Sequence, residues 1–122
     1  MTTDQRHYLG RVGEDLAARH FERLGFEVVA QRHRTRYGEL DLVVRDAGLI
    51  VFAEVMTSRV GAGHPFEALD EAKQLQVRRM GAAWLVETPD RGFYESLRFD
   101  AVGVIVTRDG ALVSLEHLEG AF

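Results

Sequence analysis

The sequence contains no cysteine, which excludes disulfide bonds, zinc–thiolate sites and a cysteine nucleophile. It has no apolar run near the roughly 20 residues that cross a bilayer, and its polar first residues lack the apolar segment of a signal peptide. Acids outnumber bases, and the net charge of -4 argues against a purely electrostatic, high-affinity nucleic-acid binder. We therefore expect a cytoplasmic protein that does not contact a membrane.

Lysine is also scarce, because Lys73 is the only lysine among 15 basic residues. The rest of the composition, 46% hydrophobic and 28% charged, is typical of a globular protein. A chain of 122 residues can enclose a real hydrophobic core. We expect one domain over residues 1–122, ending in a loose tail from about residue 117.

The spacing of apolar residues predicts a helix, three strands, a second helix, a strand and a C-terminal edge strand. The first helix is predicted from about Gln5 to Leu24, with Gly25 ending it. The second is predicted from about Phe66 to Glu87, with Pro65 in its first turn. Helices on both sides of a mixed sheet make an α/β or α+β fold. The predicted strands cover residues 26–30, 38–44, 49–56, 97–107 and 111–116.

Two carboxylates interrupt the apolar strands, where an unpaired charge costs several kcal/mol. A two- or four-residue loop at residues 46–48 places Asp41 directly opposite Glu54, whereas a three-residue loop places Asp41 opposite Ala53. Opposed carboxylates repel each other, and a divalent cation would relieve that repulsion. We interpret Asp41 and Glu54 as metal ligands. A buried ionic cluster in an unrelated small α/β interaction domain is the alternative.

Several other polar residues have two interpretations each. Glu14 lies at the edge of the first helix's apolar stripe, either as a rim acid paired with an arginine or as a third carboxylate near the strands. Lys73 falls within the apolar stripe of the second helix, where it either extends to solvent or reaches the buried acids. We interpret His20 as a hydrogen-bonded core histidine, and Arg98 with Asp100 as a structural pair.

Residues 31–36 contain three arginines and a histidine. This segment is either a solvated strand end or a phosphate-binding segment. We favour phosphate binding, because the segment leads directly into the strand that carries Asp41. The predicted nucleic-acid contacts are Arg32, Arg34, Arg36 and, beyond the third strand, Arg59.

Five motifs along the chain share one pattern: Gly13-Glu14, Gly38-Glu39-Leu40-Asp41-Leu42, Phe52-Ala53-Glu54-Val55, the helix with Lys73, and Arg98-Phe99-Asp100. Taken together, these motifs resemble the bacterial YraN-like family of predicted endonucleases, which is similar to the PD-(D/E)XK nuclease superfamily. The resemblance extends from about Gly10 to Val106. It implies a restriction-endonuclease-like core with the element order given above.

The resemblance also implies roles for individual residues. It assigns Asp41 and Glu54 as metal-binding acids, the backbone carbonyl of Val55 as a further ligand, and Glu14 as an accessory acid. The implied cofactor is Mg²⁺ or Mn²⁺, and the implied substrate is nucleic acid, with DNA as the first choice. The family pattern places a catalytic lysine two residues after Glu54, where this chain has Met56.

Methionine carries no charge and no proton to donate, so it cannot orient the attacking water or offset developing charge. Loss of one such group typically lowers the rate on the order of 100- to 1000-fold. Lys73 is the first candidate to replace it, ahead of Arg59 and His64. Two functions therefore stay open: a metal-dependent endonuclease, and a non-catalytic module that binds nucleic acid or protein. A homodimer is compatible with either.

Overall fold

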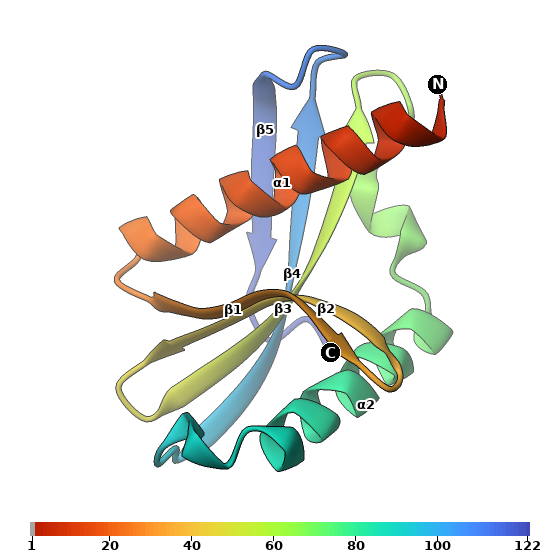
Figure 1. The fold of residues 1–122 in the computed structure, drawn as a ribbon. Helices are drawn as coiled ribbons and strands as arrows, with labels where there is room; N and C mark the ends of the chain where they lie inside the picture. Colours follow the sequence, from red (N-terminus) through yellow and green to blue (C-terminus); the bar gives the residue numbers. More distant parts are fainter. Residues whose placement is uncertain (1) are drawn as a thin grey trace.

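The computed structural model describes residues 2–122 and forms, in that range, a five-stranded mixed sheet with a helix on each face (Figure 1). This α+β restriction-endonuclease-like core has the predicted element order, so the predicted fold class is confirmed. The elements are α1 (Thr3–Arg23), β1 (Glu27–Thr35), β2 (Gly38–Asp46), β3 (Leu49–Arg59), the 3-10 turn η1 (Pro65–Ala68), α2 (Glu71–Glu87), the 3-10 turn η2 (Pro89–Arg91), β4 (Ser96–Val106) and β5 (Leu112–Leu118).

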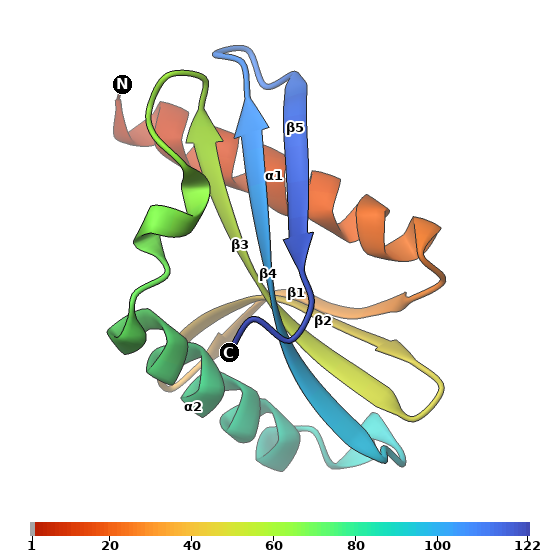
Figure 2. The same ribbon diagram turned by 180° about the vertical axis from the view of Figure 1, so that it is seen from behind.

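The strands follow the order β1-β2-β3-β4-β5, and every neighbouring pair is antiparallel except β3 and β4. That parallel pair needs a crossover, which α2 provides. β3 and β4 stay paired from Leu49–Ser96 to Arg59–Val106, whereas the β2–β3 pairing ends at Leu42–Ala53. Figure 2 shows β3 and β4 continuing together past the point where β2 turns away.

The two faces of the sheet carry separate hydrophobic cores. On one face, Phe21 of α1 packs with β-strand valines such as Val51. On the other, Trp84 of α2 packs against Phe52, with ring centroids 5.8 Å apart. Because β3 is covered on both faces, its sequence is an almost continuous apolar run, which makes Glu54 conspicuous.

The helix boundaries follow from local capping. Thr2 caps α1 in a reciprocal capping box with Gln5, and Gly25 follows its end with a φ of 97°. The prediction of one continuous helix from Phe66 is wrong. Asp70 accepts a hydrogen bond from the backbone N–H of Lys73 at 2.8 Å, so this N-cap begins α2 anew after η1. No helix within residues 2–122 is long and apolar enough to cross a membrane.

The prediction of a loose tail from about residue 117 is also wrong. β5 continues to Leu118, and the residues beyond it contact β4. The Gly120 N–H donates to Asp100 Oδ1 at 3.0 Å, and the Ala121 N–H donates to the Phe99 carbonyl at 2.8 Å. Sequence composition does not reveal these contacts, because each depends on a partner in β4 that is distant in the sequence.

Candidate metal centre

The β2–β3 hairpin has the register that a two-residue turn predicts. Asp46 pairs with Leu49 across the turn, and Ala47 adopts a left-handed φ of 51°. Leu42 pairs with Ala53, which rejects the alternative that places Asp41 opposite Ala53. The regular ladder stops there, and Asp41 Oδ2 accepts a hydrogen bond from the Val55 N–H at 2.8 Å. The Asp41 carboxylate is therefore fixed against β3 by its backbone.

The hairpin β1–β2 changes its orientation at this position. Leu40 belongs to the core under α2, whereas Leu42, two residues later, belongs to the core under α1. On β1, Arg32 lies between the paired residues Gln31 and His33 and has a φ of 52°, which is unusual for a residue other than glycine. The local turn of both strands opens the sheet beside Asp41, so side chains from both faces can meet there.

Glu54 is buried on β3 and pairs with the only lysine of the chain. Lys73 Nζ lies 3.1 Å from Glu54 Oε2, and the lysine reaches it from the first turn of α2. Ile50 and Phe52 face α2, so strand alternation places Glu54 and Met56 on that same face. Of the two interpretations of Lys73, the structure has the one in which it reaches the acids. Met56 is buried and lies two residues farther along β3.

Burial and the adjacent Glu54 carboxylate raise the pKa of Asp41 well above its usual range, against the opposing effect of the Val55 N–H. Lys73 pairs with Glu54, and no ion pair to Asp41 is formed within residues 2–122, so ionising Asp41 beside Glu54 is costly. A divalent cation would favour the ionised form of Asp41, because it supplies the missing positive charge.

Three acids converge at the opening of the sheet. Glu14, Glu39 and Asp41 each offer one oxygen within 4.8 Å of the others, and we call these three residues the acid cluster. Ligand oxygens around Mg²⁺ at about 2.1 Å lie roughly 3–4 Å apart, so modest side-chain movement would close the set. The all-oxygen donors suit Mg²⁺ or Mn²⁺. Glu39 was not predicted to be part of this cluster, although its two-residue spacing from Asp41 was a usable signal.

Glu14 reaches this cluster because α1 packs unusually close to β3. A Cβ on Gly13 would lie 1.9 Å from Thr57 Oγ1, so only glycine permits the observed approach. Arg32 Nη1 donates to Glu14 Oε1 at 2.9 Å, so Glu14 both pairs with an arginine and lies among the strand acids. Burial raises the pKa of Glu14 even though Arg32 opposes this shift.

A groove of about 410 Å³ runs beside the acid cluster, and we call it the arginine groove. A smaller pocket of about 230 Å³ next to it includes Val55 and Arg59. The structure thus gathers Arg32, Arg34 and Arg59 near the acids, but Arg36 lies elsewhere, beside the β1–β2 turn. The arginine groove is lined by Arg6, His7, Gly10, Arg11, Glu14, Arg32, Arg34 and Glu39.

Sequence reasoning missed Arg6 and Arg11 as residues near the site. They lie on the exposed N-terminal half of α1, and nothing in their own spacing marks them. They join the groove only because Gly13 lets α1 lie against β3. Their place in the groove therefore depends on tertiary packing, and no local sequence pattern could have predicted it.

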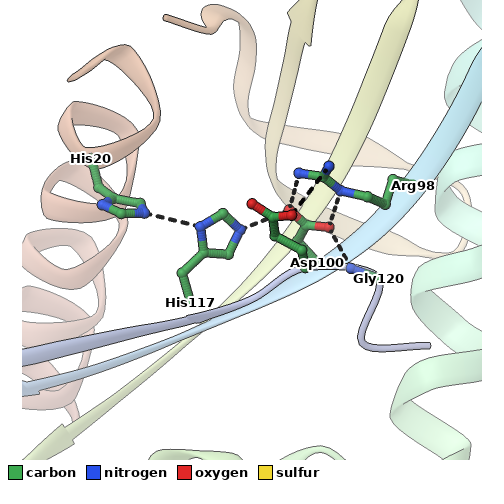
Figure 3. Close-up of polar contacts among 6 residues, drawn as sticks. His20, Arg98, Asp100, His117 and Gly120 are labelled. Carbon is green, nitrogen blue, oxygen red and sulfur yellow. Dashed lines mark hydrogen bonds and ion pairs between the residues drawn. The ribbon is translucent and has the colours of Figure 1, made fainter. Parts of the chain in front are cut away.

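A separate polar network lies at the far end of α1 (Figure 3). Arg98 binds Asp100 through two hydrogen bonds of 2.8 and 2.9 Å, as predicted for a structural pair. His117 Nε2 lies 2.7 Å from Asp100 Oδ2, and His20 Nε2 lies 3.0 Å from His117 Nδ1, so His20 has the predicted hydrogen bond. Burial alone would raise the pKa of Asp100, but the hydrogen bonds from Arg98, Gly120 and His117 outweigh it and lower that pKa.

Within residues 2–122, the sheet and the two helices that cover it define the class of protein. It is an α+β protein with a restriction-endonuclease-like core. The family model described as "Uncharacterised protein family UPF0102" matches residues 13–104. The chain therefore belongs to this family, the YraN-like group.

Relatives in the family match over nearly their whole length. A UPF0102 protein of Nocardia farcinica is 44% identical over 115 residues, which cover 93% of this chain and 88% of the relative. One of Acidothermus cellulolyticus is 38% identical over 130 residues, covering 99% and 98%. One of Pelotomaculum thermopropionicum is 39% identical over 121 residues, covering 98% of each chain. These comparisons show the family, and its description assigns no activity.

Proposed function

We propose that this protein is a metal-dependent endonuclease that hydrolyses nucleic acid, with DNA as the first substrate to test. The observation that carries the proposal is the convergence of Glu14, Glu39 and Asp41 beside a groove lined by arginines. Acids that bind a cation next to free guanidinium groups suit a phosphodiester, which needs both at once.

The residues present fit Mg²⁺ or Mn²⁺. Asp41 would hold the ion together with Glu54, the Val55 carbonyl and one or both glutamates of the acid cluster. When bound, the ion supplies charge stabilisation at the phosphate and lowers the pKa of a water ligand. Water then adds to phosphorus and one P–O ester bond breaks, which leaves a phosphate monoester and a hydroxyl group.

The protein's own residues have distinct tasks in this proposal. Lys73, whose Nζ lies 3.1 Å from Glu54 Oε2, orients the attacking water and offsets negative charge. It takes the role of the lysine that the family pattern has at position 56. Arg34 and Arg59 bind phosphates on either side of the acids. Arg32 is a positioning residue, because its ion pair holds Glu14 in the cluster.

The test is a cleavage assay with single-stranded, duplex and branched DNA in Mg²⁺ or Mn²⁺. We expect Asp41→Ala and Glu54→Ala to abolish cleavage, and Lys73→Ala to lower the rate on the order of 100- to 1000-fold. The exposed Glu71→Gln, two residues from Lys73 on α2, is the matched control and keeps its activity. Absence of cleavage by the wild type with every substrate and both metals would refute the proposal.

A second function is favoured by one observation: a buried methionine occupies the position where the family pattern has lysine. We propose, as the alternative, a non-catalytic module that binds nucleic acid through the arginine groove. Its binding would weaken steeply with salt and persist in Asp41→Ala. Salt-sensitive binding without cleavage by the wild type would favour this alternative over the endonuclease.

A further inference from the structure

A pocket of about 280 Å³ lies between the β1–β2 turn and α2, and no member of the acid cluster lines it. The turn is fixed there because Gln76 Nε2 donates a hydrogen bond to the Tyr37 carbonyl at 2.9 Å. Figure 1 shows the turn beside α2. The volume is close to the lower limit of small-molecule sites, about 300 Å³, so it suits a group the size of one nucleotide.

The lining offers an aromatic ring on an apolar surface. Tyr37 is 44% exposed and Val86 is 79% exposed, so neither belongs to a core. The guanidinium of Arg36 lies 5.8 Å from the centroid of the Tyr37 ring, at the outer range of a cation–π contact. An exposed tyrosine ring is a stacking platform for a nucleobase, and an arginine beside it can bind the adjoining phosphate.

The lining is also positively charged. Arg36 and Arg79 contribute two guanidinium groups, and Glu87 is the one acid among the lining residues. Between residues 2 and 122, neither arginine forms an ion pair or a side-chain hydrogen bond, in contrast to Arg32 and Arg98. Unpaired guanidinium groups beside an aromatic ring are suited to phosphate oxygens.

We propose that this pocket binds one unpaired nucleotide of a single-stranded nucleic acid. The base stacks on Tyr37, and the flanking phosphates bind Arg36 and Arg79. A base inside a duplex is stacked between its neighbours and cannot present its face to Tyr37. The pocket therefore selects strands with an unpaired segment.

The inference rests on the proposed function, because it makes the pocket a subsite of the same substrate. The β1–β2 hairpin carries both Tyr37 and Asp41, and α2 carries both Arg79 and Lys73. Arg79 follows Lys73 by six residues, which is about 9 Å along the helix axis. A strand held in the pocket thus lies within two turns of α2 from the lysine that pairs with Glu54.

The experiment measures binding of a fluorescein-labelled 15-mer oligothymidylate, and of a duplex of equal length, by fluorescence anisotropy in EDTA. We expect wild type to bind the single strand more tightly than the duplex. Tyr37→Ala is expected to weaken single-strand binding at least 5-fold, and Arg79→Gln at least 3-fold, with little change for the duplex. Phe93→Ala and Arg23→Gln, both at exposed positions, are the matched controls and bind like the wild type.

The proposal is overturned if Tyr37→Ala and Arg79→Gln, folded by circular dichroism, bind the single strand like the wild type, or if the duplex binds more tightly. A parallel Mg²⁺ cleavage assay separates the two proposals. Cleavage by wild type with unchanged binding by the pocket variants removes the subsite and keeps the endonuclease. Binding through Tyr37 without any cleavage removes the endonuclease and keeps the nucleotide pocket.

Discussion

The resemblance places a lysine at position 56, where this chain has methionine, and the lysine beside Glu54 is Lys73 instead. The cation that pairs with Glu54 comes from α2, and the strand position two residues after Glu54 holds a buried methionine. A lysine can deliver its charge to one carboxylate from either element, because its four-carbon chain is long and flexible. The chemistry would then depend on where the ammonium lies and not on which element carries it.

Restoring the strand lysine should compensate for loss of the helix lysine. In a Lys73→Ala background, we expect Met56→Lys to raise the cleavage rate at least tenfold over that of Lys73→Ala alone. The reason is that Glu54 is then free to pair with the new lysine. Rates under Mg²⁺ saturation, measured for both single variants and the double variant, check this. A folded double variant no faster than Lys73→Ala would contradict the idea that either position can supply the ammonium group.

The close packing of α1 predicts opposite results for two neighbouring glycines. Gly13→Ala should destabilise the protein by about 1–3 kcal/mol, because the new Cβ would collide with Thr57. Gly10→Ala meets nothing within 4 Å and should stabilise it by about 0.5–1 kcal/mol, since alanine favours the helix. Urea unfolding of both variants measures the difference. Equal stability of Gly13→Ala and wild type would show that α1 can shift without penalty.

Among the elements, the β2–β3 hairpin was the most predictable. Its two-residue turn fixes the register, so the sequence was enough to bring Asp41 to the strand of Glu54. The start of α2 was not predicted, because the apolar spacing continues without a break through Asp70. The carboxylate of Asp70 nevertheless caps a new helix there. Arg6 joins the site only through the close packing of α1 against β3, which is a tertiary effect.

The contact between α1 and β5 predicts how stability depends on pH. Burial first, then the charges of His117 and Arg23, lower the pKa of His20 below its ordinary value of 6.5. The unfolded chain therefore binds more protons near this pH, and stability rises with pH through that range. The stability that neutral His20 contributes to the fold is complete above pH 6.5 and is lost as the pH falls through the lowered pKa of His20.

Below pH 6.5, we expect the urea midpoint of the wild type to decrease with falling pH more steeply than that of His20→Gln, which cannot take up this proton. His7, an exposed histidine with no such contact, supplies the control variant His7→Gln. Unfolding curves between pH 5 and 7.5 make the comparison. Parallel pH dependence in wild type and His20→Gln would contradict a role for this histidine pair in holding β5.

At the scale of the whole molecule, charge is distributed unevenly. The net charge is -4, yet arginines of α1 and β1 surround the acid cluster. A locally basic groove can attract a polyanion that the average charge would repel. The overall charge is therefore a poor guide to the partner of this protein, and the local arrangement decides.

Metal binding should appear in the stability of the entire fold. If Mg²⁺ binds with a Kd of about 1 mM, 10 mM Mg²⁺ adds about 1.4 kcal/mol and raises Tm by a few degrees. Asp41→Asn should lose this response and be at least as stable as wild type in EDTA, because it removes a carboxylate whose ionisation is costly. Calorimetry with and without Mg²⁺ tests both expectations. An equal Mg²⁺ response in both proteins would exclude Asp41 as a ligand.

The left-handed backbone at Arg32 also affects how this protein meets other copies of itself. β1 is an outer strand of the sheet, and such strands can recruit another chain through their unpaired backbone groups. The left-handed backbone at Arg32, together with the bulge between Val28 and Ala30, breaks the straight row of backbone donors and acceptors that a new strand would need. The distortion that brings Arg32 to Glu14 thus protects β1 against aggregation and disfavours any dimer that would extend the sheet along this strand.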